Sequence, residues 1–80
     1  MEDELLKDLL AAVDQQMKSP QTRYVAQTVE RLYGMGLSLE DAREEVAWCL
    51  GEAMDEMMRT KRGFDEAVYR KALALLPVGA

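Results

Sequence analysis

Histidine is absent from this chain of 80 residues, and cysteine occurs only once. Histidine is the side chain that titrates nearest neutral pH and the commonest ligand of transition metals. Its absence excludes Ser-His-Asp and Cys-His catalytic sites within one chain, and zinc sites of the usual Cys/His kind. A lone cysteine cannot form an internal disulfide and is typical of a reducing compartment. We therefore predict a cytoplasmic chain that is not an enzyme and has no cofactor or metal site.

Long apolar runs and basic clusters are also missing. No run approaches the roughly 20 apolar residues that span a bilayer, and the first residues, MEDELLKDLL, lack the basic start of a secretory signal. The net charge is −5, whereas nucleic acids and anionic lipids attract proteins through Lys and Arg. We expect neither a nucleic acid nor a membrane as partner.

The composition that remains is that of a small globular domain. Hydrophobic residues make up 49% of the chain and charged residues 31%, which is typical of folded rather than disordered proteins. A chain this short buries only about 60–65% of its unfolded surface, so its stability is modest unless a partner adds buried area. We treat residues 1–80 as a single helical domain.

Apolar residues recur at the three- and four-residue spacing of amphipathic helices, without the two-residue alternation of strands. The pattern predicts four helices that are separated by short turns, each turn carrying residues that begin or end helices. The predicted ranges are Glu2–Met17, Pro20–Tyr33 with Ser19 as N-cap, Ser38–Arg62 after the Gly34-Met35-Gly36 turn, and, after a stop at Gly63, a last helix from Phe64-Asp65 to Pro77. The expected fold class is all-α, a compact bundle of four helices around a long third helix.

One side of each helix is expected to be buried. These sides consist of Leu5, Leu9, Val13 and Met17; Val25, Thr28, Val29 and Leu32; Ala42, Val46, Cys49, Leu50, Ala53 and Met57; and Val68, Ala72, Leu75 and Leu76. Met54 and Met58 widen the apolar arc of the third helix. We expect the methionines to fill gaps in the core, and the alternative is an adaptable binding groove.

Trp48 is the exception in the third helix, because it projects away from the Val46 side. Gly51 follows one turn later on nearly the same side and removes a side chain beside the indole. Trp48 either covers the first helix of its own bundle or belongs to a face that receives a partner. A large exposed aromatic ring beside bare backbone is typical of interfaces.

Acidic residues surround Trp48. Between Leu39 and Lys61 there are seven acidic and three basic residues, and several of the acids repel each other at i,i+4 spacing. This face is either solvated or meets cations, which would be Arg23, Arg31, Arg70 or Lys71 of this chain, a basic partner or a metal. The candidate partner-binding residues are Trp48, Gly51, Glu44, Glu45, Glu52 and Asp55.

Two segments resemble known families. A Cys-Leu-Gly-Glu helix at Cys49–Glu52 and an Asp-x-x-x-Tyr helix start at Asp65–Tyr69 lie within a segment, Asp41–Leu73, that resembles small bacterial helical proteins of a domain-of-unknown-function family. That resemblance implies the helical fold and a bacterial cytoplasmic origin, and no established activity comes with it. Met35-Gly36-Leu37, within VERLYGMGLSLEDA, resembles the start of a ubiquitin-associated domain and would be its ubiquitin-contacting loop.

The function that these observations favour is protein–protein interaction. The chain is expected to self-associate, as a homodimer, through the Trp48–Gly51 face or the outer margin of the methionine arc. The first alternative is a binding module for a basic or ubiquitin-like partner, through the acidic face or the Met35-Gly36-Leu37 loop. The second is a carboxylate-based enzyme with Glu45 or Glu52 as general base.

Overall fold

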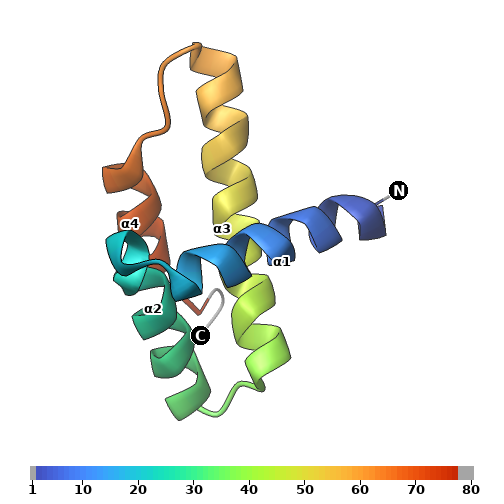
Figure 1. Ribbon diagram of the computed structural model, residues 1–80, viewed down its shortest axis with the longest axis vertical. Helices are drawn as coiled ribbons and strands as arrows, with labels where there is room; N and C mark the ends of the chain where they lie inside the picture. The colour runs from blue at the N-terminus through green and yellow to red at the C-terminus, as the bar shows by residue number, and fades with distance from the viewer. Residues whose placement is uncertain (1, 78–80) are drawn as a thin grey trace.

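Four α-helices and one short 3₁₀ turn make up the computed structural model (Figure 1), which describes residues 2–77, with side chains from residue 4 onward. The elements are α1 Glu2–Lys18, η1 Pro20–Thr22, α2 Arg23–Gly34, α3 Leu39–Thr60 and α4 Glu66–Ala74. Residues 2–77 contain no strand. The predicted all-α bundle around a long third helix is confirmed.

The helices cross rather than run side by side. In Figure 1, α1 passes over the middle of α3, and the N-terminal half of α1 extends past α3 on one side. The other side of α3 is occupied by α2 and α4. The most extensive contact is between α1 and α3. The C-terminal half of α3 therefore continues beyond the crossing, with α4 as its neighbour.

The helix starts follow the local sequence. The Ser38 hydroxyl accepts a hydrogen bond from the Asp41 amide at 3.0 Å, and the Asp65 carboxylate accepts one from the Val68 amide at 3.2 Å. Ser19 caps the 3₁₀ turn in the same way. Each of these side chains satisfies an amide that the first turn leaves without a backbone partner. The three predicted N-caps are confirmed.

The C-terminal ends of the helices agree only in part with the ends predicted from the sequence. Gly36 has a φ of +107° and follows α2, while the Leu37 amide donates to the Leu32 carbonyl, as in a Schellman motif. At the end of α3, however, Lys61 takes the left-handed conformation with a φ of 57°. The predicted stop at Gly63 is therefore wrong by two residues. The earlier turn gives the chain the length it needs to place Phe64 against α4.

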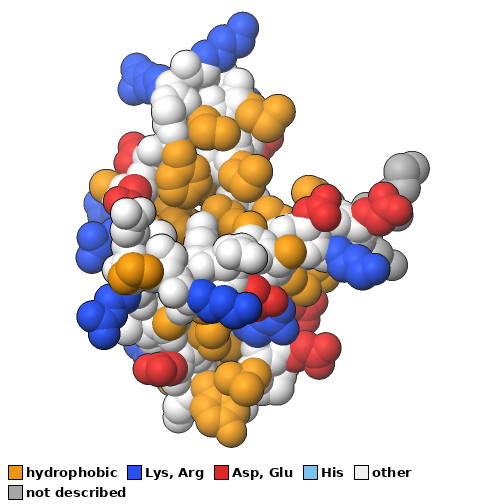
Figure 2. All heavy atoms as spheres, in the orientation of Figure 1, with side chains coloured by type: hydrophobic (Ala, Val, Ile, Leu, Met, Phe, Trp, Pro, Cys, Tyr) orange, Lys and Arg blue, Asp and Glu red, His pale blue; other side chains and the backbone are white. Residues whose placement is uncertain are grey.

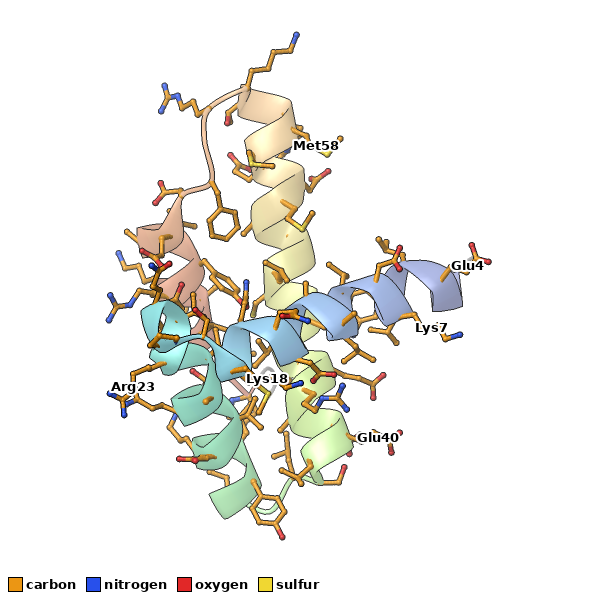
Figure 3. All side chains as sticks on the ribbon, in the orientation of Figure 1. Glu4, Lys7, Lys18, Arg23, Glu40 and Met58 are labelled. Carbon is orange, nitrogen blue, oxygen red and sulfur yellow. The ribbon has the colours of Figure 1, made fainter. Side chains whose placement is uncertain are left out.

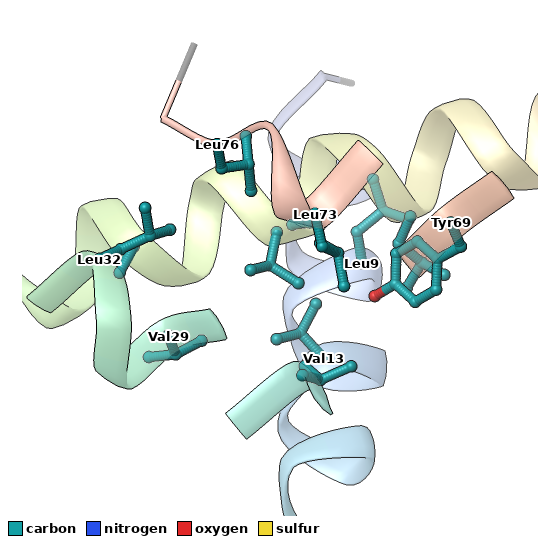
Figure 4. Close-up of a cluster of buried hydrophobic side chains, with 12 residues drawn as sticks. Leu9, Val13, Val29, Leu32, Tyr69, Leu73 and Leu76 are labelled. Carbon is teal, nitrogen blue, oxygen red and sulfur yellow. The ribbon is translucent and has the colours of Figure 1, made fainter. Parts of the chain in front are cut away.

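The core unites all four helices (Figure 4). Its buried apolar residues are Leu9, Val13, Val25, Val29, Leu32, Ala42, Val46, Ala47, Leu50, Tyr69, Leu73 and Leu76. The buried side predicted for the second helix is confirmed in full. The last fully buried residue of α3 is Leu50, and Ala53 packs partly buried against the core. The core thus lies against the N-terminal half of the longest helix.

α4 is rotated relative to the predicted orientation, although Leu76 is buried as predicted. Tyr69, Leu73 and Leu76 are buried, whereas Val68 is 52% and Leu75 is 78% exposed. Both sets have the spacing of a helical stripe, so periodicity alone does not choose between them. The Tyr69 ring packs edge-on against Phe64, and its hydroxyl donates to Gln16 Oε1 at 2.7 Å. These contacts set the rotation of α4.

Polar contacts bind α4 to α2. Arg31 donates to the carbonyl oxygens of Leu76 and Leu73, at 2.8 and 2.9 Å, near the C-terminal end of α4. A cation at this end also complements the helix dipole. At the other end, the Tyr24 hydroxyl donates to Glu66 Oε2 at 2.8 Å. Burial, followed by the Glu66 carboxylate, raises the pKa of Tyr24 to about 12.

Candidate functional site

A groove of about 810 Å³ follows the C-terminal half of α3. Residues of α1, of α3, of α4 and of the connection between α3 and α4 line it. Its apolar lining includes Leu5, Leu9, Trp48, Met57, Val68 and Tyr69. Figure 2 shows apolar side chains gathered over this half of α3, with Lys and Arg side chains at its tip. This volume lies within the range of ligand-binding pockets, about 300–1,000 Å³.

Of the methionines of α3, Met57 lines the groove, whereas Met54 and Met58 lie outside its lining. Met54 is 40% and Met58 is 72% exposed, and Met58 projects away from α4 (Figure 3). The prediction that they fill core gaps is therefore wrong for both. α1 crosses α3 at Gly51, and beyond this crossing α4 is the helix that neighbours α3, on one side only. The alternative prediction, an adaptable groove, agrees with the position of Met57 in the groove lining.

Trp48 lines the groove with its indole 48% exposed. Its own chain covers only about half of the side chain, so the first interpretation, packing on α1, accounts for part of its surface. The remaining half is available to a partner. An aromatic side chain in this position combines a large apolar area with an N–H donor, as interface aromatics do.

Gly51 has a structural role that the sequence did not indicate. A Cβ atom added to Gly51 would lie 3.1 Å from Cδ1 of Leu9. The missing side chain therefore allows α1 to approach α3 closely. Gly51 remains part of the groove lining, but it lies at the crossing of the two helices.

Four residues at positions i, i+4, i+7 and i+11 share one face of α3: Trp48, Glu52, Asp55 and Arg59. We call them the outer stripe. All four line the groove. Of the six predicted site residues, the structure brings together Trp48, Gly51, Glu52 and Asp55, whereas Glu44 and Glu45 lie outside the groove lining.

Arg43 and Arg59 of α3 both form ion pairs, Arg43 with a residue of α1 and Arg59 with residues of α3 itself. Arg43 donates two hydrogen bonds to Asp14 of α1, at 2.9 and 2.8 Å, and this bidentate pair ties the two helices together. Arg59 pairs with Asp55 at 3.6 Å and with Glu56. The Arg59 pairs are highly exposed, so they contribute little to stability and their charges can turn toward a partner.

Cations expected at the acidic face are engaged elsewhere. Arg31 binds the carbonyl groups at the end of α4. The guanidinium carbon of Arg70 lies 4.8 Å from the centre of the Tyr24 ring, within the range of a cation–π contact. The alternative in which these two residues meet the α3 carboxylates is therefore wrong, because Arg31 contacts the end of α4 and Arg70 contacts Tyr24 of α2.

Cys49 lies beside the groove, half-buried against the core. Burial, followed by the nearby Glu52 and Glu45 carboxylates, raises the pKa of its thiol to about 11. The thiol therefore keeps its proton at neutral pH and is a poor nucleophile. Among the side chains of residues 4–77, which the structure describes, there is no group of three or more His, Cys, Asp or Glu residues placed to hold a metal ion.

Comparison of the chain with protein-family models, with curated proteins and with solved structures found no match. The two family resemblances therefore stay predictions. Within the part of the chain that the structure describes, no helix combines the length and apolar character needed to cross a bilayer.

Sequence reasoning missed most residues of the groove lining, among them Leu5, Val68 and Arg59. Leu5 and Val68 carry the periodic signal of core residues and were assigned to the core for that reason. They lie in the groove because α1 extends past α3 and because α4 is rotated. Arg59 could have been identified from the sequence by its four-residue spacing from Asp55, because this spacing places both residues on the Trp48 face of the helix.

Proposed function

We propose that this chain is a protein-interaction module that binds an amphipathic helix in the groove along the C-terminal half of α3. The observation that carries the proposal is that α3, the longest helix, has no fully buried residue after Leu50. In this part of α3, Met54 and Met58 are exposed and Met57 lines the groove. Isolated helical turns gain little stability in water, and most helices are stabilised by packing of an apolar face. A partner supplies that packing here.

The shape and charge of the groove support a helix as the occupant. The groove runs parallel to α3, which is the geometry in which a helix lays its apolar face against another helix. Its charges are ordered along the outer stripe, with acidic Glu52 and Asp55 before basic Arg59. A helix with an apolar stripe and charges in the opposite order is complementary to this surface.

Trp48 provides the test, because it is the only Trp of the chain and lies at the groove. The probe is a synthetic amphipathic peptide with leucines on one face, lysines near one end and glutamates near the other. We expect saturable binding that shifts the Trp48 emission to shorter wavelength. A peptide of the same composition, scrambled to remove the leucine face, should leave the emission unchanged.

Two substitutions, one in α4 and one at its C-cap, form a matched pair for this experiment. Val68→Glu places a carboxylate in the groove, whereas Leu75→Glu places one at an exposed position outside the groove lining. We expect Val68→Glu to abolish peptide binding and Leu75→Glu to preserve it. The proposal is overturned if the wild-type emission does not change up to high micromolar peptide, or if both variants bind equally.

A second candidate surface lies at the turn between α2 and α3. Tyr33, Met35 and Leu39 are all more than half exposed there, which supports the alternative of a ubiquitin-like partner bound by Met35-Gly36-Leu37. Titration of the labelled chain with ubiquitin, followed by NMR, tests it. Shifts at Met35 that Met35→Glu removes would support this site, and an unchanged spectrum would eliminate it.

The proposal assigns the chain no catalytic activity. Of the two carboxylates considered as general bases, Glu52 lines the groove and Glu45 does not, so they do not form one site there. The single protonated thiol supports a reducing compartment, and we propose that the chain acts in the cytoplasm.

A further inference from the structure

We infer that the helix which fills this groove is α3 of a second copy of the chain, paired antiparallel across a two-fold axis. This inference rests on the proposed function and names its partner. Three properties of the chain point to a second copy: its surface area, the order of charges on the outer stripe, and the position of its exposed aromatic side chains.

The exposed surface area is larger than the average for a compact monomer of this mass, and the N-terminal half of α1, which extends past α3, contributes to it. The chain exposes 5881 Å², whereas a compact protein of 9.1 kDa is expected to expose about 4,900 Å². The excess is about 1,000 Å², and a stable protein–protein interface buries about 800 Å² on each partner. One two-fold contact along α3 would therefore bring the exposed area of each copy close to the expected value.

The order of charges selects the direction of pairing. A two-fold axis between parallel helices places each residue opposite itself, so Asp55 would face Asp55. In an antiparallel pair, Arg59 lies opposite Asp55 of the other copy, and the basic segment after α3 lies opposite Glu52. Both contacts occur twice because the axis repeats them. The two helix dipoles are also opposed in the antiparallel pair.

The same register places apolar side chains against each other. When Asp55 lies opposite Arg59, Met57 lies on the two-fold axis, and Trp48 lies beyond the end of the partner's α3 at Thr60, where the connection to α4 begins. Phe64 in that connection is 39% exposed. Leu5 of α1 flanks Trp48 in the groove lining and is 58% exposed. The partner copy thus supplies the cover that Trp48 lacks within its own chain, as expected of an aromatic anchor at an interface.

Sedimentation equilibrium of the intact chain tests whether the partner is a second copy. We expect a monomer–dimer equilibrium that reaches mainly dimer at high micromolar concentration, with Trp48 emission moving to shorter wavelength over the same range. High salt should weaken the dimer, because it screens the attraction between the exposed Asp55 and Arg59 side chains.

Reversing the charges at Asp55 and Arg59 tests whether the two α3 helices pair antiparallel. Asp55 and Arg59 are both about two-thirds or more exposed, so Asp55→Arg and Arg59→Glu should fold normally, as circular dichroism will check. Each single variant places like charges opposite each other and should weaken dimerisation about tenfold or more. The double variant restores both contacts in an antiparallel pair and should dimerise like wild type. In a parallel pair it would still place like charges together.

The outcomes separate this inference from the proposed function. A chain that stays monomeric at high micromolar concentration but binds the amphipathic peptide overturns the second copy and retains the helix-binding groove. A chain that does neither overturns both. A wild-type dimer whose double variant stays monomeric overturns the antiparallel pairing.

Discussion

Replacing Gly51 by Ala tests the crossing of α1 over α3, and two effects oppose each other. Ala in the middle of a helix is more favourable than Gly by about 0.8–1.0 kcal/mol. The added Cβ would lie 3.8 Å from Cδ2 of Leu9, an ordinary contact, but only 3.1 Å from its Cδ1. Carbon atoms rest at about 3.5–4.0 Å. Leu9 must therefore move for the methyl group to fit.

The movement of Leu9 has a cost because this side chain is almost fully buried. Overpacking of a tight core costs about 1–3 kcal/mol, and here the lower end applies, since only the tip of one flexible side chain is touched. The net effect of Gly51→Ala should be a loss of about 0–1 kcal/mol, or up to roughly 8 °C in Tm. Gly34→Ala is the control: its Cβ meets nothing within 4 Å, so it should stabilise the chain by up to about 1 kcal/mol.

Urea and thermal unfolding, followed by far-UV circular dichroism, measure both changes. Combining Gly51→Ala with Leu9→Ala removes the obstructing side-chain tip. In that background Gly51→Ala should stabilise the chain by about 1 kcal/mol, and the difference between the two backgrounds is the coupling between the residues. Equal stabilisation by Gly51→Ala and Gly34→Ala in the wild-type background would refute the close approach of α1 to α3.

Other changes test the helix ends, the Arg31 contact and the pKa of Cys49. Gly36→Ala should destabilise the chain by about 1–2 kcal/mol, because Gly36 has a positive φ that Ala adopts only with strain. Lys61→Gly should stabilise the chain by about 0.5–1 kcal/mol, because Lys61 has a left-handed φ that Gly adopts without strain. Urea unfolding measures both, and a loss of stability in both variants would contradict this reasoning. Arg31→Lys should cost about 1–2 kcal/mol in the same assay, since Lys lacks the planar fork that binds two carbonyl groups, and an unchanged midpoint would exclude that role. The thiol of Cys49 has a folded-state pKa of about 11, above its ordinary value of 9.0, so the folded state keeps this proton longer. The stability that this protonated thiol gives the folded state is complete below pH 9 and is lost as the pH rises through 11. Cys49→Ala should flatten this alkaline loss of stability, and an unfolding midpoint that falls equally in both proteins would contradict the assignment.

The helix starts were predictable because their causes are local. A hydroxyl or carboxylate at Ser38 or Asp65 meets an amide three residues further along, whatever the rest of the chain does. The buried side of α2 was predictable for a related reason. Its apolar residues form one narrow stripe, so only one rotation of the helix buries them.

The groove was not predictable, because it depends on where helices cross and end. Periodicity marks Leu5 and Val68 as apolar positions, but it does not reveal whether another helix lies opposite them. The rotation of α4 depends on Tyr69 reaching Gln16, which is 53 positions away in the chain. Gly51 was correctly identified as unusual, yet only the path of α1 shows that Leu9 lies against it.

The placement of the core at one half of α3 has a consequence for how the chain can change over generations. Residues up to Leu50 of α3 determine whether the protein folds, whereas Ala53 to Thr60 contribute no fully buried side chain. Exposed positions away from core contacts tolerate substitution with little loss of stability. Selection can therefore alter the distal turns of this helix, and with them the choice of partner, while the core sequence and its folding remain the same.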